Sequence, residues 1–416
     1  MIDNSSKIYL FTFYHLQYIH SMNSNHFIEK LKERELLYQF TSSKNPQGFD
    51  INSIYCGFDA TAPSLQAGNL LSLSMLRVAA SCNISTITLI GGATTLIGDP
   101  TDKHESRKKL PEDVVAKNLA IVQKQLQHLL PNAKLANNFD WISKFKFIDF
   151  LNNIASRLSL GAMTKLSMFA NRLANNDPLS LQEFMYPVMQ AYDFLYLFEN
   201  ENCNAQCGGS DQWCNILTGA DLINQKHGTS DTSSALGVTV ELLTTPDGRK
   251  MGKSEKGAVY INPDIFSPFE FWQYWRNVDD AMVVKCLKKL TLIDIETIED
   301  IANNNINDAK IMLANDLTSW VHSKEEAQNA QAQSHKIFVE GNMDDAKEII
   351  TNDPKLVAIL IATGEITTNS DAKRLIEQNA IKINGETISD KEYSTELKSF
   401  VLSIGKKKFF KIIVQQ

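Results

Sequence analysis

The sequence predicts an α/β protein in which a domain built on a parallel sheet is followed by a helical domain and a small α+β domain. An apolar run at residues 54–58 leads through a Thr/Pro/Ser turn into a helix at about Gly68. From Pro268 to about Gly341 the pattern is helical throughout, and a capped helix and a strand follow near the C-terminus. Strands that alternate with helices are typical of parallel sheets.

The first strand–turn–helix unit has the features of a nucleotide site. A helix N-terminus offers free backbone N–H groups and the positive end of its dipole to phosphate. Gly57 and Gly68 would let a ligand approach the backbone closely. Asp59 and Thr61, in the turn, are predicted to lie around the nucleotide.

The next strand and helix extend the same organisation. Residues 84–90 read as a strand, and residues 113–130 form a helical pattern bounded by Pro111 and Pro131. The apolar positions of this helix recur at spacings of four and three, which indicates an amphipathic helix: Val115, Leu119, Val122, Leu126 and Leu129.

A lysine loop, Lys-Met-Gly-Lys-Ser at residues 250–254, follows a turn at residues 245–249. Its two lysines, Lys250 and Lys253, would form a mobile cationic arm. Such an arm suits a polyphosphate, whose negative charge grows as its α-phosphorus is attacked. The loop therefore predicts ATP chemistry, and the alternative is a solvated turn of common composition.

The C-terminal segment carries the opposite charge from the rest of the chain. Residues 351–416 hold 10 Lys/Arg and 8 Asp/Glu, a net +2, whereas residues 1–350 hold 31 and 40, a net −9. A capped helix there carries Lys373 and Arg374, which would face the phosphates of a nucleic acid. The alternative is a helix with a solvated basic face. A polar stretch at residues 342–353 is predicted to be the preceding linker.

Composition indicates a globular cytosolic enzyme, because 43% of residues are hydrophobic and 21% are charged. The six cysteines have no zinc-site spacing, so no metal site is predicted, and no apolar run is long enough to span a membrane. Residues 1–26 are predicted to be an extension, poorly ordered or the product of a start assigned too early. An organellar presequence is the alternative, weakened by the absence of arginine.

Several independent blocks of sequence resemble the bacterial-type tyrosyl-tRNA synthetases, which are class I (class Ic) aminoacyl-tRNA synthetases. The resemblance runs from about Phe27 to the C-terminus. The blocks are Tyr-Cys-Gly-Phe-Asp at 55–59, Gly-Gly-Ala-Thr-Thr-Leu-Ile-Gly-Asp-Pro at 91–100, Asn-Asn-Phe-Asp-Trp at 137–141, Tyr-Pro-Val-Met-Gln-Ala-Tyr-Asp at 186–193, Gly-Gly-Ser-Asp-Gln at 208–212, and the lysine loop.

The resemblance implies a domain order and an assembly. Residues 27–267 would form a Rossmann-like nucleotide-binding catalytic domain, with an inserted dimerisation region at about 150–190. Residues 268–345 would form a helical anticodon-side domain. Residues 351–416 would form an RNA-binding domain similar to a ribosomal small-subunit protein. A homodimer is expected from the family alone.

The resemblance also assigns site residues. Tyr55 and Asp193 would surround the substrate phenolic hydroxyl, supported by Asn138, and Gln212 would lie near the substrate carboxyl group. Asp99, Tyr186 and Gln190 would bind the tyrosine ammonium group. The residues expected around ATP are Cys56, Gly57, Asp59, Thr61, Gly68, Gly209, Asp211 and Lys253.

The implied reaction has two steps. The carboxylate of L-tyrosine attacks the α-phosphorus of ATP, pyrophosphate leaves, and the tyrosyl group then passes to the 3′ end of tRNA(Tyr). Lys250 and Lys253 would close over the pyrophosphate, with Lys103 and Arg107 on its other side. Magnesium would arrive with ATP.

One block departs from the family pattern. Gln66-Ala67-Gly68-Asn69 stands where His-Ile-Gly-His is usual. Asn69 can still donate a hydrogen bond, but Gln66 lacks a possible imidazolium charge beside phosphate, which predicts a slower first step. A catalytically inactive RNA-binding relative is one alternative. A tryptophan-specific enzyme is another, disfavoured because an indole would not require Tyr55 and Asp193.

Overall fold

The computed structural model describes residues 23–41, 49–100, 110–228, 235–246, 248, 250–254, 257–338, 348–383, 386–405 and 408–415. The chain divides into two compact units. The first comprises the residues up to Ser267 together with Tyr274–Ser323, and the second comprises Pro268–Gln273 with the chain from Lys324 onward. Most of the extension predicted at 1–26 lies outside the described residues, and residues 23–33 form a helix.

The first unit is built on a six-stranded sheet of order β1-β6-β5-β2-β3-β4. All neighbouring strands are parallel except β1 and β6. The prediction of an α/β fold with a parallel sheet is confirmed. The strand bounds are β1 Gln39–Phe40, β2 Ser53–Phe58, β3 Ser85–Ile90, β4 Lys134–Asn137, β5 Ala205–Gly209 and β6 Leu236–Val240.

Short 3₁₀ turns and helices follow the strands where the chain leaves the sheet. η1 Ala67–Asn69 leads into α2 Leu70–Ser81, and η2 Thr94–Leu96 follows β3. The amphipathic helix predicted over 113–130 is α3, Glu112–Leu129. After β5 come η4 Ser210–Gln212 and α10 Trp213–His227.

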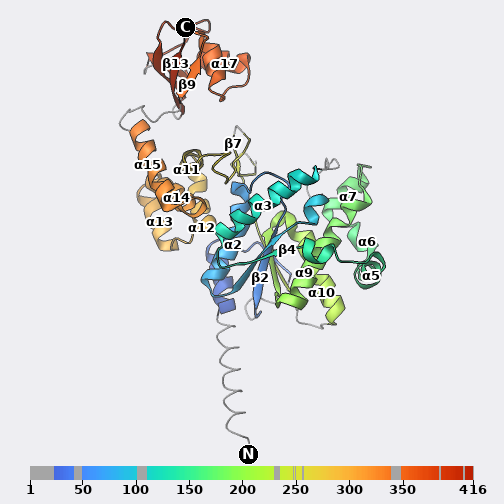
Figure 1. The fold of residues 1–416 in the computed structure, drawn as a ribbon. Coiled ribbons are helices and arrows are strands. Elements are labelled where there is room, and N and C mark those ends of the chain that lie inside the picture. The colour runs from blue at the N-terminus through green and yellow to red at the C-terminus, as the bar shows by residue number, and fades with distance from the viewer. Residues whose placement is uncertain are drawn as a thin grey trace, which may run out of the picture. The chain divides into compact units, whose positions relative to one another are not determined.

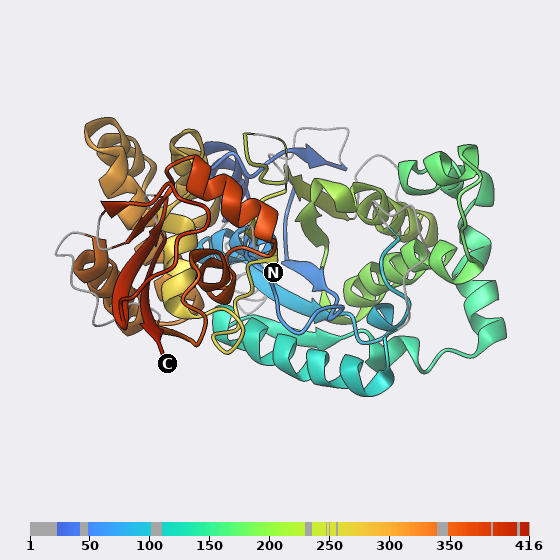
Figure 2. The same ribbon diagram turned by 90° about the horizontal axis from the view of Figure 1, so that it is seen from above.

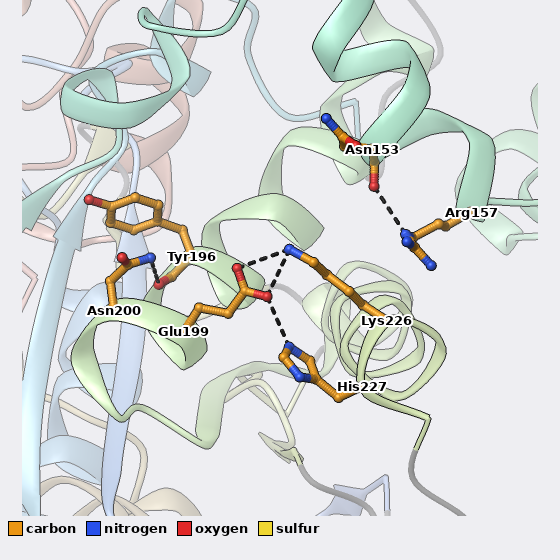
Figure 3. A network of polar contacts seen from close by, with 7 residues as sticks. All are labelled: Asn153, Arg157, Tyr196, Glu199, Asn200, Lys226 and His227. Carbon is orange, nitrogen blue, oxygen red and sulfur yellow. Dashed lines mark hydrogen bonds and ion pairs between the residues drawn. The ribbon is translucent and has the colours of Figure 1, made fainter.

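Helix α9, Tyr186–Glu201, packs along α10 (Figure 1). Figure 3 shows how their C-terminal ends are joined: the Glu199 carboxylate lies 2.8 Å from Lys226 Nζ and 2.9 Å from His227 Nε2. Because α9 carries Tyr186, Gln190 and Asp193, this contact helps to fix the helix that supplies much of the predicted pocket.

An insertion of short helices separates β4 from α9. It contains α4 Phe139–Ile142, α5 Phe147–Asn153, η3 Ala155–Arg157, α6 Leu160–Met163, α7 Ser167–Ala174 and α8 Leu181–Phe184. Arg172 and Glu183 form an ion pair at 3.2 Å, with side chains only 2% and 6% exposed. The pair ties α7 to α8.

Helices also make up the last part of the first unit, as the pattern after Pro268 predicts. α12 Asp280–Leu290, α13 Ile295–Asn304 and α14 Ile306–Val321 lie at the opposite end of the unit from α5–α7 (Figures 1 and 2). They are joined to the sheet domain by polar contacts. Arg34 donates to the Thr291 carbonyl at 2.8 Å, and Ser74 of α2 donates to the Leu290 carbonyl at 3.2 Å.

A hairpin and a helix lie between the sheet domain and these helices in the sequence. β7 Lys253–Ser254 and β8 Gly257–Ala258 form a small antiparallel hairpin. α11 Pro268–Arg276 follows it, and its last residues belong to the first unit.

The second unit contains α15 Lys324–Phe338 and a five-stranded sheet of order β11-β10-β12-β13-β9 with α16 Leu356–Ala362 and α17 Asn369–Glu377. This α+β arrangement agrees with the predicted fold class. The N-cap of α17 is Thr368, whose hydroxyl accepts the Asp371 N–H. The strands are β9 Glu348–Thr351, β10 Ile381–Ile383, β11 Glu386–Thr387, β12 Ser399–Ile404 and β13 Lys408–Val414.

The linker predicted at 342–353 is wrong at its C-terminal end. Residues 348–351 form β9, which pairs in parallel with β13 and places Ile349 beside Ile412. The strand has only two isoleucines, and the polar residues around them leave no strand pattern in the local sequence. Its pairing partner lies about sixty residues downstream, so no local pattern reveals it. The turn expected at 384–385 lies outside the described residues.

Among the helices that the structure describes, none combines the length and the apolar composition needed to cross a bilayer.

Replacing Glu183 with alanine should leave the Arg172 guanidinium buried without its carboxylate. We expect the free energy of unfolding to fall by about 3–5 kcal/mol, measured by urea denaturation. Glu201→Ala is the matched control, because Glu201 pairs with the exposed Lys134, and a surface pair is worth about 0–1 kcal/mol. Equal losses for the two variants would contradict a stabilising role for the buried pair.

Candidate active site

A cavity of about 400 Å³ opens where the order of the parallel strands reverses, between β2 and β5. Loops diverge on either side of such a point, which leaves a crevice at the carboxyl ends of the strands. The cavity brings together residues predicted from six separate blocks of sequence. These are Tyr55, Cys56, Gly57, Asp59, Thr61, Gln66, Gly68, Asn69, Asp99, Asn138, Tyr186, Gln190, Asp193, Gly209, Asp211, Gln212 and Lys250.

Asp193 is the buried acid of the cavity. Its carboxylate accepts a hydrogen bond from Trp141 Nε1 at 2.8 Å and from Asn138 Nδ2 at 2.9 Å. Burial raises its pKa to about 7, although both hydrogen bonds favour the charged form. The nearby Tyr55 hydroxyl is fully buried and has no hydrogen-bond partner among the described residues. These groups form a polar patch suited to a ligand hydroxyl.

A second carboxylate, Asp59, lies at the end of β2. It accepts the Tyr186 hydroxyl at 2.8 Å and the Thr94 hydroxyl at 2.7 Å. Thr94 in turn accepts from Asn138 at 3.0 Å, which joins Asp59 to the Asp193 patch. The resemblance assigns Asp59 to the ATP side, whereas its contacts join it to Tyr186, which the resemblance assigns to the substrate ammonium group.

A third group of polar side chains connects three segments. Gln212 Nε2 donates to Asp99 at 2.8 Å, and Gln190 Nε2 donates to Gln212 Oε1 at 3.3 Å. Asn215 donates to the same oxygen at 3.1 Å. One carboxylate and two amides thus face the cavity from the residues after β3, from α9 and from η4.

The start of η1 carries the departure from the family pattern. Asn69 Oδ1 accepts the Gln66 backbone N–H at 2.8 Å. The amide oxygen of Asn69 therefore caps the turn, and its NH₂ group remains the side that can donate to a ligand. Both residues line the cavity, so the substitutions preserve donors at this helix entrance.

The lysine loop and the residues just after it pack against this helix entrance. After the loop, the Val259 carbonyl accepts the Ala67 N–H at 2.8 Å, and Ile261 N–H donates to the Leu65 carbonyl at 3.0 Å. Gly252 has φ of +96°, and a Cβ added there would meet Gly68 N at 2.8 Å. A glycine is therefore required at this position for both its backbone conformation and its close approach.

Of the four cationic residues predicted for the site, the structure describes the side chain of Lys250 but not those of the other three. Lys250 Nζ lies 3.8 Å from an Asp211 carboxylate oxygen, and both residues line the cavity. The backbone of Lys253 lies in β7, whereas its side chain is outside the described part. Lys103 and Arg107 fall in residues 101–109, also outside it.

Several contributing residues were missed by sequence reasoning. Trp141 and Thr94 lie inside sequence blocks that signalled the site, but only the fold shows that one holds Asp193 and the other holds Asp59. Trp141 itself is fixed by stacking on Tyr196, with ring centroids 4.3 Å apart. Trp275 also lines the cavity from α11, and no local signal separated it from core aromatics.

In the part of the chain that the structure describes, no cluster of three or more His, Cys, Asp or Glu side chains could hold a metal ion. The polar groups of the cavity instead provide hydrogen-bond donors and acceptors for an organic ligand.

The raised pKa of Asp193 gives a pH-dependent stability. Between about pH 4 and pH 7 the unfolded carboxyl, with its ordinary pKa of 3.8, is ionised while the folded one retains its proton. This group should therefore make stability fall as pH rises through that window, by up to about 1.4 kcal/mol per pH unit, and level off above it. Asp193→Asn should show a shallower fall when the two proteins are unfolded in urea at pH 4 to 8. Parallel curves would contradict the raised pKa.

The comparisons with known proteins agree with this geometry. Residues 51–339 match the family described as tRNA synthetases class I (W and Y). The tyrosine–tRNA ligase of Pelagibacter ubique (strain HTCC1062) is 38% identical over 409 residues, covering 93% of this chain and 99% of that protein. The tyrosine–tRNA ligase of Fusobacterium nucleatum is 35% identical over 399 residues, covering 92% and 97%.

A solved structure gives the same result. The C-terminally truncated mitochondrial tyrosyl-tRNA synthetase of Aspergillus nidulans superposes with a TM-score of 0.67 at 27% identity, covering 75% of this chain and 94% of that one. The family predicted from the sequence is confirmed. The chain belongs to the class I tRNA synthetases, in the tyrosine–tRNA ligase family.

Proposed function

We propose that this protein is an active tyrosine–tRNA ligase that forms tyrosyl-adenylate from L-tyrosine and ATP and transfers the tyrosyl group to tRNA(Tyr). The observation that carries the proposal is the buried Asp193 carboxyl group near the buried Tyr55 hydroxyl in the lining of the cavity. A phenolic hydroxyl placed between them would satisfy buried polar groups that an apolar ring would leave unpaired.

The remaining contacts orient the two reactants. Asp99, Tyr186 and Gln190 would bind the substrate ammonium group, and Gln212 would lie near its carboxyl group. Asp59 would act on this end of the substrate through the Tyr186 hydroxyl that it accepts. Cys56, Gly209 and Asp211 would line the adenosine and ribose, with Gly57, Thr61 and Gly68 close to ATP.

In the first step the tyrosine carboxylate attacks the α-phosphorus, and the protein contributes position and positive charge. Lys250 would leave Asp211 and move toward the departing pyrophosphate, together with Lys253 of the same loop. Gln66 and Asn69 would donate neutral hydrogen bonds at the helix entrance. Lys103 and Arg107 would supply charge from the opposite side.

Magnesium would enter with ATP, held mainly by phosphate and water. In the second step the terminal adenosine hydroxyl of the tRNA accepts the tyrosyl group.

The proposal extends to a homodimer and to a location in the cytoplasm. Exposed apolar side chains gather in the insertion at about 150–190 and the residues just before it, including Phe147, Leu160 and Leu181 at 73%, 66% and 76% exposure. Covering them in a homodimer would remove an apolar surface from water. We place the enzyme in the cytoplasm, where its tRNA partner is charged.

Exchange of radiolabelled pyrophosphate into ATP tests the activity directly. Tyrosine should support exchange, and tryptophan and phenylalanine should support much less. Exchange with tryptophan alone would identify the tryptophan-specific alternative. No exchange with any amino acid, together with tRNA binding, would identify a non-enzymatic RNA-binding relative.

Asp193→Ala should weaken the use of tyrosine more than the use of phenylalanine. Loss of the carboxylate leaves the substrate hydroxyl and Tyr55 poorly satisfied, at a cost of about 1–3 kcal/mol in tyrosine kcat/KM. Phenylalanine makes no such bond, so its activation should fall less. An equal fall for both amino acids would overturn the assignment of Asp193 to the hydroxyl.

Truncation near Gly341 should separate the two steps of the reaction. Every residue assigned to activation lies upstream, so adenylate formation should persist. tRNA charging at moderate salt should fall, because contacts from the basic C-terminal domain, including Lys373 and Arg374, are lost. Unchanged charging by the truncated protein would remove the RNA-binding role assigned to residues 351–416.

A further inference from the structure

Tyr274, in the last turn of α11, touches the lysine loop. The Gly252 backbone N–H donates to the Tyr274 hydroxyl at 2.9 Å. The Gly252 carbonyl accepts the Val259 N–H at 2.8 Å, so both backbone polar groups of Gly252 are engaged. Gly252 is buried, which makes a lost partner costly for its N–H group.

The residues around this contact hold the loop from the same side. Met251 Sδ lies 3.9 Å from the Cys286 thiol on α12, and Met251 N–H donates to the Leu243 carbonyl at 2.8 Å. Burial raises the pKa of the Tyr274 hydroxyl above its ordinary value. The Tyr274 ring packs edge-on against Trp275, 5.0 Å between centroids, which fixes its direction.

The opposite side of Gly252 faces the helix entrance. A Cβ on Gly252 would approach Gly68 N to 2.8 Å, so the loop and the entrance are in direct backbone contact. Gly252 is thus held between Tyr274 and Gly68. Any displacement of this peptide would move the neighbouring Lys250, whose ammonium group reaches the cavity beside Asp211.

We propose that Tyr274 is a positioning residue for the first step, whose hydroxyl holds the Gly252 peptide so that the lysine loop stays packed on the helix entrance. The proposal rests on the proposed function for its kinetic consequence but not for its structural one. Tyr274 touches neither reactant, and its effect passes through Gly252 to the phosphate end of the cavity. The tyrosine end, around Asp193, is independent of it.

The test removes only the hydroxyl. Tyr274→Phe keeps the ring against Trp275 and leaves the Gly252 N–H without its acceptor. The rate of adenylate formation at saturating tyrosine should fall about fivefold to tenfold, the worth of one buried hydrogen bond. KM for tyrosine should stay within twofold, and Tyr393→Phe, a control in the second unit, should form adenylate at the wild-type rate. Unchanged adenylate formation in Tyr274→Phe, or an equal rise in KM for tyrosine, would overturn the proposal.

Tryptic cleavage after Lys250, followed by mass spectrometry, gives a readout that does not depend on activity. The full-length Tyr274→Phe protein should be cut several times faster there than the wild type and the Tyr393→Phe control. Equal cleavage rates would overturn the proposal that the Tyr274 hydroxyl holds the lysine loop in place. If the wild type performed no tyrosine-dependent exchange, the proposed function would fail while this measurement still decided the structural role of Tyr274.

A double-mutant cycle that combines Tyr274→Phe with Gly252→Ala tests whether Tyr274 affects adenylate formation through Gly252. The added methyl group should force the loop away from Gly68 by itself. If Tyr274 acts through Gly252, the double variant should form adenylate about as slowly as Gly252→Ala alone. Fully multiplicative effects would mean that Tyr274 acts by another path, and would overturn the proposal.

Discussion

The structure depends on one constraint, the pairing of β2 in parallel with both β3 and β5. Because the chain runs outward from β2 in both directions, the loops after β2 and β5 separate and leave the cavity between them. The same pairing places Tyr55 of β2 beside Gln206 of β5, and the loop after β2, with Asp59, starts near the end of β5, with Gly209. The start of α2, the residues after β3 and the start of α9 then reach one crevice from different directions.

Within that crevice the donors converge on two carboxylates, the buried Asp193 and the half-buried Asp59. Asp193 receives Trp141 and Asn138, and Asp59 receives Tyr186 and Thr94. Asn138 donates to Thr94 as well as to Asp193, so the two ends of the substrate pocket share one hydrogen-bond network. Burial pulls the pKa of Asp193 upward against those donors. The Asp193 carboxyl group therefore has a pKa near neutral pH, and a hydrogen bond from a ligand hydroxyl can shift its protonation equilibrium toward the charged form.

Sequence reasoning predicted the sheet, the main helices and most side chains of the pocket, because strand and helix periods and short blocks are local signals. It could not predict contacts between blocks. Asp59 was assigned to ATP because it follows a strand near a helix start, yet its partners Tyr186 and Thr94 lie on other elements. Strand β9 was missed for the same reason, since only pairing with β13 makes its short apolar pair a strand. Trp275 reads as a core residue until α11 is placed beside the cavity.

The glycine of the lysine loop is required by the backbone around it. Gly252 takes a left-handed conformation and lies against the backbone of Gly68, so a residue with a side chain there would carry both backbone strain and a steric clash. The two glycines allow two loops that are nearly two hundred residues apart to meet with no side chain between them. The distance between the lysine arm and the helix entrance is then set by backbone contact, while Tyr274 and the Val259 N–H hold the peptide in place. The lysine loop thus touches the helix entrance through an uncharged glycine, while its lysines can bring positive charge to a phosphate.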